Sequence, residues 1–140
     1  TASEVLAKGV SLCIGKSHLL VALLRANGIA AGLVYQRLRF DALDGPYCTH
    51  CLVALRLDDG GWYRCDARGN RPGIDCEFTP GRENLAFKVE HVGERLWPEV
   101  WAAPWPEVVA AMRVTRDLDH YKQAPIDVGP PEHATSVVIG

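Results

Sequence analysis

Two apolar segments, residues 48–57 and 62–67, flank a short polar turn and predict one β-hairpin. The turn is Asp58-Asp59-Gly60, and three-residue hairpin loops typically place glycine at the third position, where the backbone is left-handed. This loop sets a register in which one face of the hairpin is wholly apolar, with Leu57 opposite Gly61, Leu55 opposite Tyr63, Val53 opposite Cys65 and Cys51 opposite Ala67. The turn and the hydrophobic alternation therefore favour the same register, with the apolar face on the core.

The opposite face of this hairpin brings two polar residues together. In the same register His50 and Asp66 are diagonal neighbours, with Cα atoms about 7–8 Å apart, a distance that an imidazole and a carboxylate can bridge. A two-residue loop would put them on opposite faces. The face also carries Leu52, Arg56, Trp62, Arg64 and Arg68.

A cysteine stands at the predicted start of a long apolar helix. Cys13 follows the glycine-containing turn 9–12, and the leucines of residues 13–26 predict a helix that is buried over much of its circumference and ends at Asn27-Gly28. Unpaired N–H groups and the positive end of the helix dipole favour the thiolate form of a cysteine in this position. The thiolate is the nucleophilic form.

Cys13, His50 and Asp66 together make a possible thiolate–imidazole–carboxylate system. Taken singly, a buried cysteine, an edge histidine and a turn aspartate are common structural residues. As a set, the imidazole takes the thiol proton and later protonates a leaving amine, while the carboxylate orients the ring and supports its charged form. The three residues therefore predict cysteine-dependent acyl transfer.

Two blocks of residues resemble the transglutaminase-like superfamily, whose members share a papain-like core. In that family the nucleophilic cysteine is followed twelve residues later by arginine and then by Ala-x-Gly-Ile, and this chain has Cys13, Arg25, Ala26, Gly28 and Ile29 at those places. The family also has a histidine at the start of a strand, a tryptophan twelve residues on and an aspartate four beyond, as in His50, Trp62 and Asp66. The resemblance spans about residues 9–70.

Three short segments depart from the family pattern. His50-Cys51-Leu52 replaces the common His-Ala-Trp, Asp66-Ala67-Arg68 replaces Asp-Pro-Thr, and Ala30-Ala31-Gly32 replaces Pro-Ala-Arg. The absent tryptophan removes a bulky wall beside the histidine, so the shape of the substrate is not implied by the resemblance.

The resemblance implies one transglutaminase-like domain over residues 1–140, with an α+β, papain-like core in which the nucleophile helix packs against an antiparallel sheet. It implies catalysis by Cys13, His50 and Asp66 through a thioester on Cys13, without a cofactor or a metal. The substrate would be a peptide or protein amide. The acyl acceptor would be water, as in a peptidase or amidase, or a primary amine, as in a transglutaminase.

The alternative function is a non-catalytic binding or structural module. Cys48 and Cys51 have the spacing of a zinc knuckle, and Cys65 and Cys76 are the remaining candidate ligands. Against zinc, a knuckle is usually followed by a second close pair, whereas ten residues separate Cys65 from Cys76.

Other residues near the predicted site have weaker signals. The Cys13 backbone N–H is one candidate oxyanion donor, and Gln36 and Tyr47 are candidates for a second. His18 is a poor alternative base, because a residue five positions along a helix does not face Cys13. Lys16 could tune the thiol, although an exposed lysine is the default interpretation.

Outside the two blocks we expect strands at 29–40, 74–78 and 86–92, a helix from Pro104 to about Arg113, and an irregular tail. Trp97, Trp101 and Trp105 are expected to pack against one side of the C-terminal segment rather than to bind a ligand.

The charge balance excludes two partner classes. A net charge of -2 and 23% charged residues provide no basic field for nucleic acid or for an anionic membrane. Five cysteines, an odd number, favour free thiols in a reducing, cytoplasmic compartment. The start at Thr1, without methionine, is compatible with a fragment or processed form whose upstream segment, with any targeting signal, is missing, and the sequence leaves the oligomeric state open.

Overall fold

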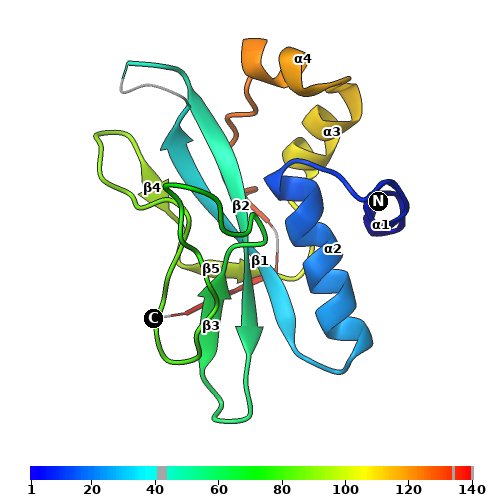
Figure 1. Ribbon diagram of the computed structural model, residues 1–140, viewed down its shortest axis with the longest axis vertical. Coiled ribbons are helices and arrows are strands. Elements are labelled where there is room, and N and C mark those ends of the chain that lie inside the picture. The colour runs from blue at the N-terminus through cyan, green and yellow to red at the C-terminus, as the bar shows by residue number, and fades with distance from the viewer. Residues whose placement is uncertain (41–43, 134, 140) are drawn as a thin grey trace.

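A computed structural model describes residues 1–40, 44–133 and 135–139 and shows an α+β fold (Figure 1). The elements in chain order are α1 (Ala2–Lys8), α2 (Cys13–Ala26), β1 (Ala31–Arg39), β2 (Tyr47–Arg56), β3 (Trp62–Cys65), β4 (Arg95–Leu96), β5 (Glu99–Trp101), α3 (Pro106–Val114), α4 (Leu118–Gln123) and β6 (Ser136–Val138).

The strands form one antiparallel sheet in the order β3-β2-β1-β5-β6, and β4 pairs with β1 beside β5. Figure 1 shows the four helices on one side of this sheet, with α2 nearest to the central strands. The expected packing of the nucleophile helix against an antiparallel sheet is therefore confirmed.

The register of the β2–β3 hairpin is the predicted one. Val53 pairs with Cys65 and Leu55 with Tyr63, and the Leu57 N–H donates to the Gly61 carbonyl at 3.1 Å. Alternate β2 residues face the two sides of the sheet, so that Cys51 and Val53 lie in the main core and Leu52 in a smaller cluster on the other side. β3 ends at Cys65, so the expected pair of Cys51 with Ala67 does not form.

Helix α2 has the predicted ends but not the predicted burial. It begins at Cys13 and ends at Ala26, and Gly28 takes the left-handed conformation with φ of 76°. Its fully buried residues are Ile14, Gly15, Ser17 and Val21. Leu23 is 44% exposed, because only one side of α2 rests on the sheet, and the expectation of burial around most of the helix is wrong.

Arg25 connects the C-terminal end of α2 to the sheet through two hydrogen bonds. Arg25 donates from Nε to the Ala31 carbonyl and from Nη2 to the Ala102 carbonyl, both at 2.9 Å. The end of α2 is thereby tied to β1 and to the segment that follows β5.

The main core is centred on aromatic side chains. Trp105 is fully buried; its ring stacks on Tyr35 with centroids 4.0 Å apart and meets Trp97 and Trp101 edge-on at 5.1 and 5.6 Å. The expected packing role of the three tryptophans is confirmed, although they lie on strand, loop and helix cap rather than on one regular segment.

The second half of the chain departs most from expectation. The helix expected from Pro104 is α3. Residues 74–78 and 86–92 are not strands; the segment between β3 and β4 forms bends, turns and isolated bridges at Arg71–Ile74 and Thr79–Arg82. The tail, expected to be irregular, supplies β6, and α1 and α4 were not anticipated.

No single helix in the described part of the chain has the length and hydrophobicity to cross a membrane. Helices α1 and α2 together are long and apolar enough to span a membrane, but they are bent by 107° relative to each other.

Candidate active site

Close packing at the start of α2 positions Cys13. Thr1 and Glu4 form a reciprocal capping box at the start of α1, and Gly9 ends α1 with φ of 68°. A Cβ on Gly15 would stand 1.9 Å from the Ser11 Oγ, so only glycine allows the chain before Cys13 to lie this close to α2. The buried Ser17 hydroxyl, one turn farther on, donates to the Cys51 carbonyl at 2.8 Å and holds α2 against β2.

Cys13 lies beside the edge of β2 that β3 leaves open. Along this edge the Val53 position pairs with β3, and the Thr49 N–H donates to the Ile126 carbonyl at 2.5 Å. Between them, the backbone N–H of Cys51 contributes to lowering the pKa of the Cys13 thiol.

His50 and Asp66 form a buried pair. The His50 Nε2 lies 2.7 Å from the Asp66 Oδ2, and the two residues are 4% and 6% exposed. The other carboxylate oxygen, Oδ1, accepts the Arg68 N–H at 2.9 Å. With Nε2 donating to the carboxylate, Nδ1 is the ring nitrogen left for the thiol. Asp66 has left the strand, yet its side chain still reaches across to His50 as the register predicts.

Cys13 and His50 shift each other's pKa in opposite directions. Burial raises the pKa of the Cys13 thiol, but the charge of His50, a hydrogen bond from its ring and the Cys51 N–H outweigh burial and lower the pKa overall. Burial lowers the pKa of His50, but the Cys13 thiolate and the hydrogen bond to Asp66 outweigh it and raise the pKa well above its usual range. This arrangement stabilises a thiolate–imidazolium pair.

The other cysteines have a different chemistry. Burial raises the pKa of Cys51, of Cys76 and of Cys65, the last to about 11. Cys48 is buried, and its thiol makes a hydrogen bond with Tyr121. None of the five cysteines, all of which lie in the described ranges, is in a disulfide. Among Cys13, Cys51, Cys65 and Cys76, only Cys13 has surroundings that lower the thiol pKa and so favour a thiolate.

A cavity of about 1060 Å³ opens at the thiol. Cys13 and His50 both line it, whereas Asp66 lies behind the His50 ring and does not. One wall is α4, through Leu118, Tyr121 and Lys122, and another is the segment 84–91. The Phe87 ring meets His50 edge-on, with centroids 5.2 Å apart. Cys13 and His50 are thus accessible to a substrate from one side.

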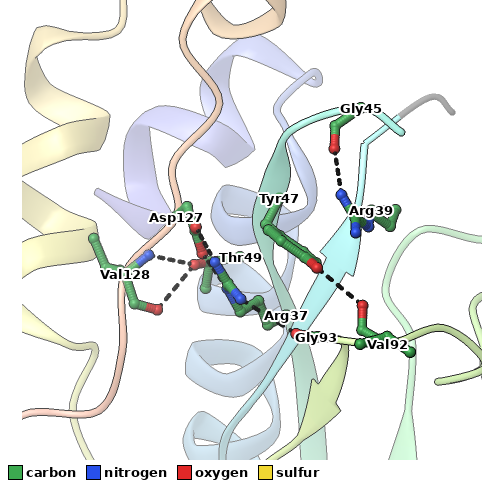
Figure 2. A network of polar contacts seen from close by, with 9 residues as sticks. All are labelled: Arg37, Arg39, Gly45, Tyr47, Thr49, Val92, Gly93, Asp127 and Val128. Carbon is green, nitrogen blue, oxygen red and sulfur yellow. Dashed lines mark hydrogen bonds and ion pairs between the residues drawn. The ribbon is translucent and has the colours of Figure 1, made fainter. Parts of the chain in front are cut away.

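The C-terminal strap, residues 126–128, anchors the chain beyond α4 to the sheet (Figure 2). The Thr49 hydroxyl accepts the Val128 N–H at 3.0 Å and donates to the Val128 carbonyl at 3.1 Å. Arg37 makes a two-pronged contact with the Asp127 carboxylate, at 2.7 and 2.6 Å. These contacts, together with the Thr49 N–H bond to Ile126, fix the strap one residue away from His50.

Thr49→Val is expected to loosen the strap. Valine matches the shape of threonine but leaves the Val128 N–H and carbonyl without their partner, at a cost of about 1–3 kcal/mol in the free energy of unfolding. Urea unfolding measures the loss, and hydrogen exchange at the Val128 amide should become faster. The exposed Thr79→Val is the control, expected within about 0.5 kcal/mol of the wild type. Equal stability and exchange in all three proteins would contradict this role of Thr49.

The structure separates the other candidates from the site. Gln36 donates to the Phe87 carbonyl at 3.1 Å and Tyr47 donates to the Val92 carbonyl at 2.9 Å, and neither residue lines the cavity. Neither is therefore placed to bind an oxyanion. His18 also lies outside the cavity, and burial lowers its pKa. Lys16 does line the cavity.

The zinc interpretation receives no support from side-chain geometry. Cys51 faces the main core, where its thiol donates to the Leu52 carbonyl at 3.7 Å. Among the residues that the structure describes, no group of three or more His, Cys, Asp or Glu side chains could hold a metal ion.

Two parts of the site were not found from the sequence. The Phe87 ring forms the wall beside His50, whereas Leu52, which strand alternation places on the same face of β2 as His50, is buried in the smaller cluster. The strap comes from the tail, which has no periodic pattern. No local signal identifies either, since both depend on contacts between segments far apart in the chain.

The family comparison agrees with the geometry over the first half of the chain. The model of the transglutaminase-like superfamily matches residues 1–67, a range that contains Cys13, His50 and Asp66. No match was found among curated proteins or among solved structures. This match supports the resemblance to the transglutaminase-like superfamily over residues 1–67, the segment that carries the candidate site.

Proposed function

We propose that this protein transfers acyl groups from peptide or protein amides through a thioester on Cys13. The observation that carries the proposal is the opposite displacement of two pKa values, with Cys13 lowered and His50 raised, in a cavity open to substrate. A lowered thiol pKa increases the thiolate fraction of Cys13, and the thiolate is the nucleophilic form. The core around this site is expected to be papain-like.

The acylation step uses both members of the pair. The Cys13 thiolate attacks the amide carbonyl carbon, a C–S bond forms and the carbonyl oxygen becomes an oxyanion. The His50 imidazolium then donates its proton to the amide nitrogen, the C–N bond breaks, and a free amine leaves while the acyl group remains on sulfur as a thioester. Asp66 holds the ring through Nε2, so that Nδ1 faces the reaction.

The start of α2 supplies one stabilising donor for the oxyanion. The first N–H groups of a helix have no partner inside the helix, and the residue before Cys13, Leu12, makes no side-chain cap. The Cys13 N–H is therefore directed toward the cavity end of the helix, where negative charge is also favoured by the helix dipole.

The deacylation step reverses the proton movement. Neutral His50 removes a proton from water or from a primary amine, which attacks the thioester carbonyl, and the C–S bond breaks to restore the thiolate. Water gives a carboxylic acid and a primary amine gives a new amide. The same three residues serve both outcomes, and hydrolysis is the outcome we propose first because water is always present at an open cavity.

A trapping experiment tests this proposal. Tryptic peptides of casein, offered with hydroxylamine, should yield peptide hydroxamates and, before the trap is added, an acyl adduct on the Cys13 peptide in mass spectra. The Cys13→Ser variant should give neither product, since serine has no comparable nucleophile at neutral pH. If wild-type protein with intact secondary structure forms no adduct and no hydroxamate from this peptide pool, acyl transfer is rejected.

A further inference from the structure

The cavity at Cys13 is unevenly charged. Its lining includes six cationic side chains, Lys16, Arg39, Arg68, Arg71, Lys88 and Lys122, against three carboxylates, Asp75, Glu90 and Glu94. The chain as a whole carries a net charge of -2, so the positive charge is concentrated at this cavity rather than spread over the molecule.

Two of the three carboxylates are already committed to the backbone. Glu94 accepts three N–H groups, from Arg39 at one oxygen and from Glu90 and His91 at the other, each at 2.9 Å. Asp75 accepts the Glu77 N–H at 3.1 Å. These carboxylates hold the walls of the cavity through the backbone, and neither forms an ion pair with a cation of the described residues.

The cations of the cavity have no acidic partner of their own. Within residues 1–40, 44–133 and 135–139, none of the six forms an ion pair with Asp or Glu, whereas Arg37 and Arg64, which do not line the cavity, both form one. A group of cations that face one solvent-filled space without counter-charges favours an anionic ligand there.

Arg68 is the cation most closely tied to the reacting groups. Its backbone N–H is held by the Asp66 carboxylate, and its guanidinium lies over the Phe87 ring at 5.5 Å from the centroid. That same ring meets His50 edge-on. The Phe87 ring therefore contacts both the Arg68 guanidinium and His50, and no carboxylate of the described residues pairs with that guanidinium.

Lys16 extends the positive charge to the other reacting residue. It follows Cys13 by three positions on α2, so its side chain lies on the same side of the helix, and it lines the cavity with Cys13. Lys16 therefore lies one helical turn from Cys13, and Arg68 lies over the ring that His50 contacts, both on the lining of the same cavity.

We propose that the substrate of this site is acidic, a peptide with Asp or Glu carboxylates beside the amide that reacts, and that Arg68 and Lys16 bind those carboxylates. The inference rests on the proposed function of the site but concerns recognition alone. It requires no group beyond the side chains that line the cavity.

The test measures binding to the Cys13→Ala protein, so that no chemistry is needed. The probes are two peptides with the same neutral dye, Gly-Glu-Gln-Glu-Gly and Gly-Gln-Gln-Gln-Gly, titrated by fluorescence anisotropy at low salt. The acidic peptide should bind at least about tenfold more tightly, and the difference should shrink as salt shortens the range of the charges. In the same background, Arg68→Gln and Lys16→Gln should each reduce the preference, whereas Arg113→Gln, an exposed cation of α3 outside the cavity, should leave it unchanged.

Equal binding of the two peptides, or no binding of either, overturns the proposal. So does a preference that all three cation variants reduce equally, because the effect is then one of overall charge. Thermal unfolding verifies that each variant is folded. If Arg68→Gln does not fold, Lys16→Gln still tests the proposal. The two proposals can fail separately. If the trapping experiment gives no product but the acidic peptide still binds more tightly, acyl transfer is rejected and the recognition of acidic peptides is retained.

Discussion

Replacement of His50 by glutamine is expected to reduce acyl transfer by about 10²–10⁴-fold. The loss has two causes. The Cys13 pKa is lowered chiefly by the charge and hydrogen bond of His50, so the thiolate fraction at neutral pH falls without the imidazole. The leaving amine also loses the group that protonates it, and glutamine replaces neither property.

Glutamine is the informative replacement because its amide can still donate to the Asp66 carboxylate. Alanine would leave that carboxylate buried without its partner, at 2.7 Å in the wild type, and could unfold the site. The measurement is the rate of hydroxamate formation from the peptide pool, with circular dichroism as a check on folding. His133→Ala, an exposed histidine of the C-terminal segment, is the control and should retain full activity. A folded His50→Gln protein with wild-type activity would remove His50 from the mechanism.

Trp105→Ala is expected to lower the free energy of unfolding by about 3–5 kcal/mol. Trp105 is fully buried and is in contact with three other aromatic rings, those of Tyr35, Trp97 and Trp101. The large cavity that alanine leaves cannot collapse easily, because these rings come from β1, β5 and the loop before it. Small domains are stable by only about 5–15 kcal/mol, so this one change is a large fraction of the total.

The matched variant is Trp105→Phe. The indole N–H of Trp105 is buried without a hydrogen-bond partner among the described residues, so phenylalanine keeps an aromatic ring and removes a polar group that costs free energy. Urea unfolding should therefore show a much smaller loss for phenylalanine than for alanine. An exposed change, Val92→Ala, should stay within about 0.5 kcal/mol of the wild type. If alanine costs no more than phenylalanine, the aromatic cluster is not the centre of the core.

The hairpin and the nucleophile helix could be predicted because their signals are local and agree with one another. Gly60 sets the turn, and alternation along β2 sets the register from which the His50–Asp66 contact follows. Gly28 ends α2 where a left-handed residue is needed. Each of these features is decided within about fifteen neighbouring residues.

The segment between β3 and β4 could not be predicted in the same way. Residues 74–78 and 86–92 have side chains typical of strands, but strand propensity depends strongly on context, and these residues form turns, bends and isolated bridges instead. Phe87 takes its position from contacts with His50 and Arg68, and Leu85 from the small cluster on the far side of the sheet. Tertiary contacts decide this segment.

The burial of α2 and the strap were missed for a related reason. Leu23 suggested an all-round apolar helix, but the sheet covers one side only, and α1 lies beside α2. The strap depends on a threonine of β2 and an arginine of β1 that meet residues nearly eighty or ninety positions later in the chain. Such pairings have no signature in either segment alone.

We propose that Cys13 is a thiolate because the charge and the hydrogen bond of His50 stabilise that form. The direct measurement is the rate of Cys13 alkylation by iodoacetamide as a function of pH, followed by mass spectrometry of the Cys13 peptide in wild type and in His50→Gln. The wild-type rate should rise through a pKa below about 8.5, the ordinary thiol value, and the variant should titrate near or above that value. Selective labelling of Cys13 over the other four cysteines at pH 6 should also disappear in the variant. Stabilisation of the Cys13 thiolate by His50 is contradicted if Cys13 titrates as an ordinary thiol in the wild type, or if its titration is the same with and without His50.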